Sequence, residues 1–256
     1  MTGRGTNTYV LGEGPCLVVD PGPAIDSHLD AIRAEGERRG GIAGVLVTHS
    51  HADHQEAVRP LGEQVLWGPA QTTGLATERL EISESPPAEP FELGTPIGRL
   101  SVVPTPGHAS DHACFGFGAV VLCGDLVLGE GSSIVPPRFA GGSLAAYMRS
   151  LDYLEAIDAE LLLPGHGPAI TDPAARIAEY REHRLMRERL LLAALDAGER
   201  ARTELLDAAW ADVPEPMRGG ADVAMQAHLE KLEDEGRLPE GVEPLGWTPS
   251  AGELQA

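Results

Sequence analysis

The feature that most constrains the fold is the stretch "VLVTHSHADH", residues 45–54, where histidines crowd together directly after an apolar run. The run "GVLVT" is rich in β-branched residues, which predicts a strand buried on both faces of its sheet. In an extended loop that leaves a strand, residues two apart point the same way, so His49 and His51 can converge on one point. Asp53 and His54 follow where the chain can turn into a helix, and they can serve a second point.

Three more polar residues come just after predicted strands. Each lies beside glycine or proline, which lets the backbone turn sharply. Zinc binds neutral imidazole nitrogens and carboxylate oxygens, and one ion needs about three such protein ligands. The number of candidates therefore suggests two ions at one sheet edge. The three residues are His108 in "TPGHASDH", Asp125 in "LCGD" and His166 in "LLLPGHG".

The order of these residues resembles a known signature. His49-x-His51-x-Asp53-His54, followed by His108, Asp125 and His166, is similar to the HxHxDH pattern of the metallo-β-lactamase superfamily. The early "VVDPG" resembles the strand-end aspartate of that family, here Asp20. The resemblance covers residues 1 to about 172. The segments "GTNTYV", "PGHASDH" and "GDLVLGEGSS" are most similar to one branch, the beta-lactamase-like protein 2 group.

The resemblance implies an α/β fold, a four-layer αββα sandwich, with two zinc ions per chain. It implies that His49, His51 and His108 hold one ion, that Asp53, His54 and His166 hold the other, and that Asp125 bridges them. The reaction expected of such a centre is hydrolysis by a metal-bridging hydroxide, which Asp53 would also orient as a catalytic residue. The sequence contains no GxSxG motif for a serine nucleophile.

Other residues near these motifs allow more than one interpretation. Asp20 is expected to orient a metal ligand, with a simple turn cap as the alternative. For His112 three interpretations stay open: a residue that orients a ligand, an acid for the leaving group, or a histidine on a surface loop. Cys123 is expected to be a small buried core residue. The remaining histidines on predicted helices, His28, His183 and His228, are expected to be ordinary polar residues.

The chain divides into three predicted parts. Residues 1–172 form the catalytic domain, 173–200 a connector helix that starts at an Asp-Pro pair, and 201–256 a small helical domain of winged-helix character ending in a hairpin-like segment. Within the first part, we expect an early hairpin, one helix over 53–61, an exposed acidic loop over 82–96 and a helix over 143–157 capped by its first serine.

The charge limits the partners of the protein. Its 256 residues carry 39 Asp and Glu against 19 Lys and Arg, a net charge of −20. This field repels nucleic acids and anionic membranes on average. No apolar run resembles a signal peptide or a membrane span, and the three cysteines form no framework, so we expect a cytoplasmic protein with reduced thiols. A homo-oligomer stays an open alternative.

Three substrate hypotheses remain. A small ester, thioester or lactone is favoured by the charge, whereas cleavage of single-stranded RNA is implied by the branch resemblance. A winged-helix DNA-binding regulator with a vestigial metal site is weakest, because residues 201–256 hold four basic and twelve acidic side chains. Four arginines on the connector helix are expected to form a salt-bridged solvated face, or alternatively an anion-binding wall: Arg181, Arg184, Arg187 and Arg189.

Overall fold

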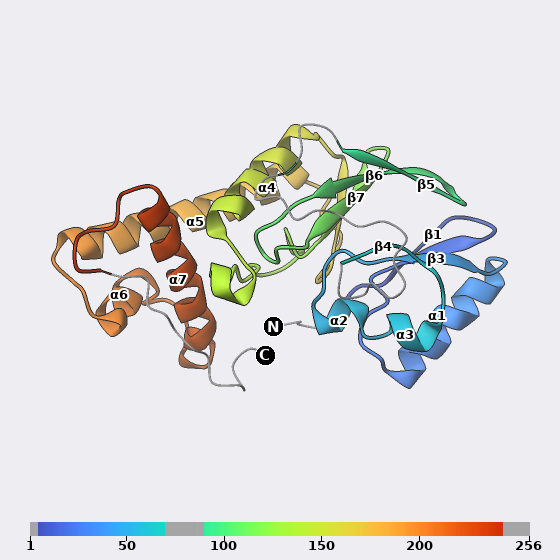
Figure 1. Ribbon diagram of the computed structural model, residues 1–256, viewed down its shortest axis with the longest axis horizontal. Coiled ribbons are helices and arrows are strands. Elements are labelled where there is room, and N and C mark those ends of the chain that lie inside the picture. The colour runs from blue at the N-terminus through green and yellow to red at the C-terminus, as the bar shows by residue number, and fades with distance from the viewer. Residues whose placement is uncertain (1–4, 70–85, 87–89, 243–256) are drawn as a thin grey trace.

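The computed structural model describes residues 5–69, 86 and 90–242, which include two β-sheets with helices outside them (Figure 1). The first sheet has the order β1-β2-β3-β4, with strands Tyr9–Leu11, Cys16–Val19, Ile42–Leu46 and Val65–Trp67. The second sheet has the order β5-β6-β7-β8-β9, with strands Phe91–Thr95, Gly98–Pro104, Ala113–Phe117, Val120–Gly124 and Leu161–Pro164.

Strand directions explain why polar residues gather at one edge. In the first sheet, β1 and β2 form the predicted hairpin, and β2 and β3 run parallel. In the second sheet, β6, β7 and β8 alternate in direction, so β6 and β8 point the same way, and β9 is parallel to β8. The carboxyl ends of β6, β8 and β9 therefore lie at the same edge, and the chain continues from these ends to His108, Asp125 and His166.

Three apolar clusters define four layers. Alternation along β2 sends Val18 toward the outer helices and Leu17 and Val19 toward the other sheet. The cluster between the sheets also contains Phe115, and a third cluster on the far side of the second sheet contains Tyr147 from α4. The layers are helices, sheet, sheet, helices, which is the αββα sandwich that the sequence predicts. The outer helices are α1 (Asp26–Arg38) and α3 (Val58–Leu61) on one side, α4 (Leu144–Ala156) and α5 (Pro173–Asp196) on the other.

The N-terminal caps of α4 and α5 are the ones that the sequence predicts. The Ser143 hydroxyl accepts the Ala146 N–H at 3.2 Å, and the Asp172 carboxylate accepts the Ala175 N–H at 3.1 Å. Each cap satisfies one of the amide groups that a helix leaves unpaired at its start. Both predicted helix starts are therefore confirmed.

The single helix predicted for 53–61 is wrong, because the chain forms two short helices there, α2 (Ala52–Gln55) and α3. Pro60 gives the physical reason. Its ring would collide with the carbonyl of the residue four positions earlier, Glu56, in one continuous helix. The chain instead makes a turn at 56–57 before it resumes as α3.

The exposed loop predicted for 82–96 is also wrong in part. Residues 91–95 form β5, which pairs antiparallel with β6, while 82–85 and 87–89 lie outside the described residues. In "FELGT" only the central Leu93 is buried, between the sheets, and Phe91 is exposed. A short edge strand with one core residue has too weak an alternation to stand out from an acidic, proline-rich loop.

The C-terminal part is helical. The second half of α5 packs with α6 (Arg202–Ala209) and α7 (Arg218–Asp234) around Leu191, Trp210, Met225 and Leu229, and η3 (Glu215–Met217) contacts α7. Figure 1 shows this group at one end of the molecule, with α7 turned toward α4. The described stretch 201–242 contains no strand, and the rest of the predicted hairpin lies outside the described residues, so the winged-helix character stays a prediction.

None of the helices in the described ranges combines the length and the hydropathy that crossing a bilayer requires.

Candidate metal centre

The structure brings together all seven side chains that the sequence singled out as candidate ligands. They form three overlapping groups, and within each group the potential ligand atoms lie within 4.8 Å of one another. His49, His51, Asp53 and His54 come from the segment after β3, and the others from the segments after β6, β8 and β9. The groups are His49, His51 and His108; His49, His54 and Asp125; and Asp53, His54 and His166.

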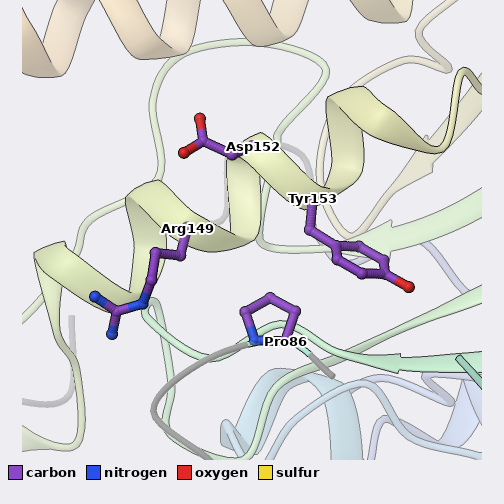
Figure 2. A pocket seen from close by; sticks show the side chains of 4 residues that line it. All are labelled: Pro86, Arg149, Asp152 and Tyr153. Atoms are coloured by element: carbon purple, nitrogen blue, oxygen red, sulfur yellow. The ribbon is translucent and has the colours of Figure 1, made fainter. Parts of the chain in front are cut away.

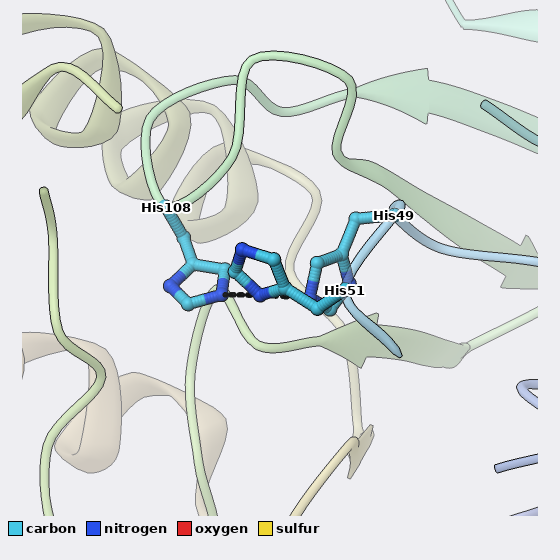
Figure 3. Close-up of side chains that lie close together, drawn as sticks. All are labelled: His49, His51 and His108. Carbon is cyan, nitrogen blue, oxygen red and sulfur yellow. Dashed lines mark hydrogen bonds between the residues drawn. The ribbon is translucent and has the colours of Figure 1, made fainter. Parts of the chain in front are cut away.

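In the first group three imidazoles point at one another (Figure 3). His51 Nδ1 lies 2.9 Å from His49 Nε2 and 3.0 Å from His108 Nε2. The outer nitrogens have acceptors of their own: His49 Nδ1 lies 3.0 Å from the Thr48 hydroxyl, and His108 Nδ1 lies 2.7 Å from the Ile134 carbonyl. Because a neutral imidazole carries one proton, the inner nitrogens of His49 and His108 then present lone pairs. Such close lone pairs repel unless a proton or a cation lies between them.

The second and third groups combine carboxylates and imidazoles. His54 Nε2 lies 3.5 Å from Asp125 Oδ1 and 3.6 Å from Asp53 Oδ2, while His166 Nε2 lies 3.3 Å from an oxygen of each aspartate. The outer nitrogen of His166 donates to the Gly5 carbonyl at 3.0 Å. Among the described residues, the buried atoms His54 Nε2 and Asp125 Oδ1 have no hydrogen-bond partner. Buried polar atoms are rarely left in this state unless a ligand or ion satisfies them.

The pKa values of the histidines differ between the first and the third group. Burial, together with the neighbouring histidines, lowers the pKa of His49 well below its ordinary value, and burial lowers the pKa of His108 to about 4. Burial alone would also lower the pKa of His166, but its contacts with Asp125 and Asp53 raise it to about 10. The first group therefore excludes protons and the third attracts positive charge. A divalent cation satisfies both conditions, so the donor set fits divalent metal.

Asp20 lies behind the cluster and is buried. Its carboxylate accepts from the Thr48 amide and the Thr48 hydroxyl, each at 2.8 Å, and its Oδ2 lies 2.9 Å from His54 Nδ1. It holds a left-handed backbone, with φ 48°, which is uncommon for aspartate. Its contacts turn His54 Nε2 toward the other ligands, as carboxylates behind metal-binding histidines do. Thr48 links Asp20 to His49, and it escaped sequence reasoning because it reads as the last residue of a strand.

His112 is buried, so the interpretation as a surface-loop histidine is wrong. Its Nδ1 lies 2.8 Å from the Thr105 hydroxyl, and the Asp125 amide donates to its Nε2 at 3.2 Å. Burial lowers its pKa to about 3. Because Nε2 acts as an acceptor here, the ring holds the backbone of Asp125 and has no proton aimed at a leaving group.

Two glycines allow the cluster to close. A Cβ at Gly165 would lie 2.3 Å from Asp125 Oδ1 and 2.7 Å from His54 Cε1, inside the second group. Gly124 has φ 47°, and a Cβ there would lie 2.6 Å from His112 Nε2. Any side chain at either position would displace a candidate ligand or the residue behind it.

The segment before β1 also reaches the cluster, which the sequence did not reveal. The Thr6 hydroxyl donates to Asp53 Oδ2 at 3.0 Å, and the Asn7 side-chain amide donates to the Pro164 carbonyl at 3.0 Å. A short polar stretch has no periodicity that would indicate such contacts. His51 is exposed and Asp53 half-buried, so the cluster opens to solvent at these two residues.

The connector arginines divide into two kinds. Arg181 contacts Asp152 and Glu155, and Arg189 contacts Glu182, as a salt-bridged surface would. Arg184 and Arg187 are buried, so a solvated face is the wrong interpretation for these two. The reason is that α4 and α6 pack against α5, and that α7 shares an apolar cluster with the second half of α5.

The structure also places Cys123 and the histidines that the sequence assigns to helices. Cys123 is fully buried in the cluster beneath α4, as predicted. His28 lies on α1 beside the Thr8 hydroxyl at 2.9 Å. His183 and His228 lie on α5 and α7, and His228 is buried with its ring edge-on to Trp210.

A pocket of about 350 Å³ lies elsewhere, on α4 (Figure 2). It is lined by Pro86, Arg149, Asp152 and Tyr153 and includes none of the seven candidate ligands. Asp152 already pairs with Arg181. We therefore place the chemistry at the histidine and aspartate cluster, where unsatisfied donor atoms converge.

Comparisons with known proteins show the family of the chain. The family model described as Metallo-beta-lactamase superfamily matches residues 1–61 and 55–166. A beta-lactamase-like protein 2 homolog from Drosophila melanogaster is 30% identical, over 93% of this chain and 85% of its own. An atrochrysone carboxyl ACP thioesterase from Aspergillus chevalieri is 31% identical, over 90% of this chain and 76% of its own.

Among solved structures, a metallo-beta-lactamase family protein from Thermus thermophilus superposes with a TM-score of 0.71. It is 26% identical, and the superposition covers 93% of this chain and 92% of that chain. The sequence match to the Drosophila relative and the superposition on the Thermus structure thus each cover nearly the whole chain. The chain therefore belongs to the metallo-beta-lactamase superfamily, as a hydrolase whose site carries histidine and aspartate side chains able to bind divalent metal.

Proposed function

We propose that the protein is a dinuclear zinc hydrolase that cleaves a small thioester. The observation that carries the proposal is the convergence of inward-facing ring nitrogens whose outer nitrogens are already satisfied. Nitrogen and carboxylate donors of this kind suit zinc. His49, His51 and His108 would hold one ion, Asp53, His54 and His166 the other, and Asp125 would contact both.

When bound, such cations lower the pKa of water toward neutrality and polarise a carbonyl oxygen. The protein's own groups keep the ligands in place: Asp20 orients His54, the Ile134 carbonyl orients His108, and His112 holds the Asp125 backbone. Burial alone would raise the pKa of Asp53, but contacts with His166 and His54 outweigh it and lower that pKa to about 2. Asp53 is therefore ionised at neutral pH, where it can orient a water molecule by accepting its hydrogen bond but cannot act as an acid.

The leaving group favours a thioester over an oxygen ester or lactone. A thiol has a pKa of about 8.5, so a thiolate departs without a proton from the enzyme. An alkoxide is far more basic and benefits from an acid. His112, the residue that the sequence suggested for this role, accepts a hydrogen bond from Asp125 at the nitrogen that faces the site. The relative named as an acyl-carrier-protein thioesterase supports the same substrate class.

Charge supports a small substrate over RNA. The net charge of −20 repels a polyanion, and the arginines that could have formed a local binding patch on α5 are buried or paired with carboxylates. RNA cleavage, which the branch resemblance implied, is kept as an outcome of the test. DNA binding has less support still, because α7 ends in the acidic run "LEKLEDEG".

The test uses purified zinc-loaded protein with three probes: an N-acetylcysteamine thioester, the oxygen ester of the same acid, and a single-stranded RNA. We expect release of thiol from the first, slower hydrolysis of the second and intact RNA. All turnover should disappear in Asp53→Ala. Cleavage of RNA that is lost in Asp53→Ala, with no turnover of the thioester, would show that the substrate class is wrong.

A further inference from the structure

One face of α5 holds the loop that connects two parts of the metal centre. Arg176, Tyr180 and Arg184 are spaced four residues apart, so they lie on the same face of the helix. All three contact the loop 126–134. That loop begins directly after the candidate ligand Asp125 and ends at Ile134, whose carbonyl faces His108. The helix thus contacts a segment that touches the centre at both ends.

The first two side chains of this face hold the near part of the loop. Arg176 donates to the Leu128 carbonyl at 3.0 Å and to the Gly131 carbonyl at 2.7 Å. The Leu128 amide donates to the Tyr180 hydroxyl at 2.9 Å, and the Arg176 guanidinium lies 4.9 Å from the centre of the Tyr180 ring. The Tyr180 hydroxyl also interacts with the backbone of Ser133, whereas the hydrogen bonds of Arg176 to this loop end at Gly131.

Arg184 holds the end of the loop that lies beside His108. Its guanidinium donates to the Ser133 carbonyl and lies 5.2 Å from the centre of the Tyr147 ring. The Ser133 hydroxyl lies 3.1 Å from His108 Nδ1, and the carbonyl of Ile134 lies 2.7 Å from the same nitrogen. A single residue therefore separates Arg184 from the side chain of a candidate ligand.

The environment of Arg184 indicates that this contact matters. Its side chain is buried, and no carboxylate in the described part of the chain lies within ion-pair distance of it. Its Nε atom also has no partner among the described residues. Burying a guanidinium with so little compensation is costly, and an apolar side chain of similar length would pack against Tyr147 without that cost.

We propose that Arg184 is a positioning residue for the metal centre. By fixing the Ser133–Ile134 segment it directs the Nδ1–H of His108 outward and the Nε2 lone pair toward His49 and His51. The inference rests on the proposed function in one respect, that the three-histidine group binds a metal ion. It makes α5, which lies beyond the residues matched by the family model, part of the device that sets metal affinity.

The experiment measures cobalt(II) affinity by chelator competition and the visible absorption spectrum of the bound ion, on the full chain. We expect Arg184→Met to weaken binding by about tenfold and to change the spectrum, because outer contacts of ligand histidines contribute about that much. Arg184→Lys, which can still donate one hydrogen bond to Ser133, should recover part of the loss. The matched control is Arg176→Met, which removes the same kind of contact from the same loop and should change affinity by less than about twofold.

Melting temperatures of all variants separate affinity from folding. If Arg184→Met does not fold, Ser133→Ala carries the test, because it removes the hydroxyl beside His108 and should weaken binding in the same direction. Unchanged affinity and spectrum in Arg184→Met, or equal losses in Arg176→Met, would overturn the proposal. Wild-type protein that binds cobalt but hydrolyses no thioester would contradict the proposed substrate, while the comparison of variants would still decide the role of Arg184.

Discussion

Two regions of the molecule bury polar side chains, and they do so in opposite ways. At the metal centre, ring nitrogens and carboxylate oxygens point at one another, and two of these buried atoms have no partner among the described residues. Around the second half of α5, buried charges are mostly paired: Glu188 contacts Lys231 and Arg237, and Arg187 contacts Asp212. Four buried nitrogens there, one each from His183, Arg184, Gln226 and His228, also have no hydrogen-bond partner among the described residues, but they belong to no group of converging ligand atoms. The first arrangement costs stability unless a cation is bound, whereas the second holds helices together. The convergence of ligand atoms, and not the lack of hydrogen-bond partners alone, therefore distinguishes the site from the scaffold among the described residues.

The largest expected effect comes from removing Asp125, the residue that we propose contacts both ions. Asp125→Ala should reduce hydrolysis by about 10³-fold or more, because metal ions contribute several kcal/mol of transition-state stabilisation and each 1.4 kcal/mol is a factor of ten. Turnover and metal content of the purified variant test this. Asp152→Ala, in the α4 pocket, is the control and should keep full activity. Equal losses in both variants would contradict the placement of the site.

Removing an ion pair around α5 should have the reverse effect, a loss of stability without a loss of metal. Glu188→Gln leaves the partly buried Lys231 without its buried partner and should lower the free energy of unfolding by about 3 kcal/mol. Metal content and the metal affinity of the folded protein should stay unchanged. Urea unfolding gives the stability, and elemental analysis gives the metal. A metal loss without destabilisation would mean that the two regions are not distinct in the way described.

A smaller effect on metal affinity is expected from Asp20, which lies behind the candidate ligands. Asp20→Asn keeps the shape of the side chain but weakens its hold on His54 Nδ1 and on the Thr48 hydroxyl. Metal affinity should fall by about 10- to 100-fold, as it does when the outer partner of a ligand histidine is lost. Chelator competition measures it, with the exposed Asp30→Asn on α1 as the control. An affinity within about twofold of wild type would argue that Asp20 serves the backbone turn alone.

The smallest expected effect is on the pH dependence of metal-free protein. Burial opposes the charged form of His166, but contacts with Asp125 and Asp53 outweigh it and raise the pKa from 6.5 to about 10. The stability from this raised pKa is fully present below pH 6.5 and is lost as the pH rises through about 10. Chelator-treated protein should therefore melt at a lower temperature at about pH 10 than at about pH 6.5, with a weaker dependence in His166→Gln. The same dependence in metal-loaded protein would contradict the assignment, because a bound cation replaces the proton.

The sequence predicted the residues of the centre because four of them are close together in the chain and the others come shortly after strands. His49 and His51 are two apart on an extended segment, Asp125 directly follows β8, and His108 and His166 follow the ends of β6 and β9 within a few residues. The fold follows from the same apolar strands, because a continuous apolar run such as Leu17, Val18 and Val19 predicts a strand that is buried on both faces.

The contacts that support the centre could not be predicted, because they join distant segments without any periodic pattern. Thr6 lies 47 residues from Asp53, and Arg184 lies 51 residues from Ser133. Arg184 and Arg187 were misinterpreted because a helix that alternates arginine and glutamate has the pattern of a solvated surface. Only the packing of α4, α6 and the α7 side chains around α5 shows that they are buried.

The central claim is that seven side chains form one centre for two divalent cations, and metal stoichiometry tests it most directly. Elemental analysis should be combined with a zinc titration of chelator-treated protein, in wild type and in two single variants, one from each half of the centre. We expect two zinc ions per chain in wild type and a weakened first or second ion in His51→Ala and His166→Ala respectively. A single ion per chain at saturation, or two ions that remain bound in both variants, would contradict the account.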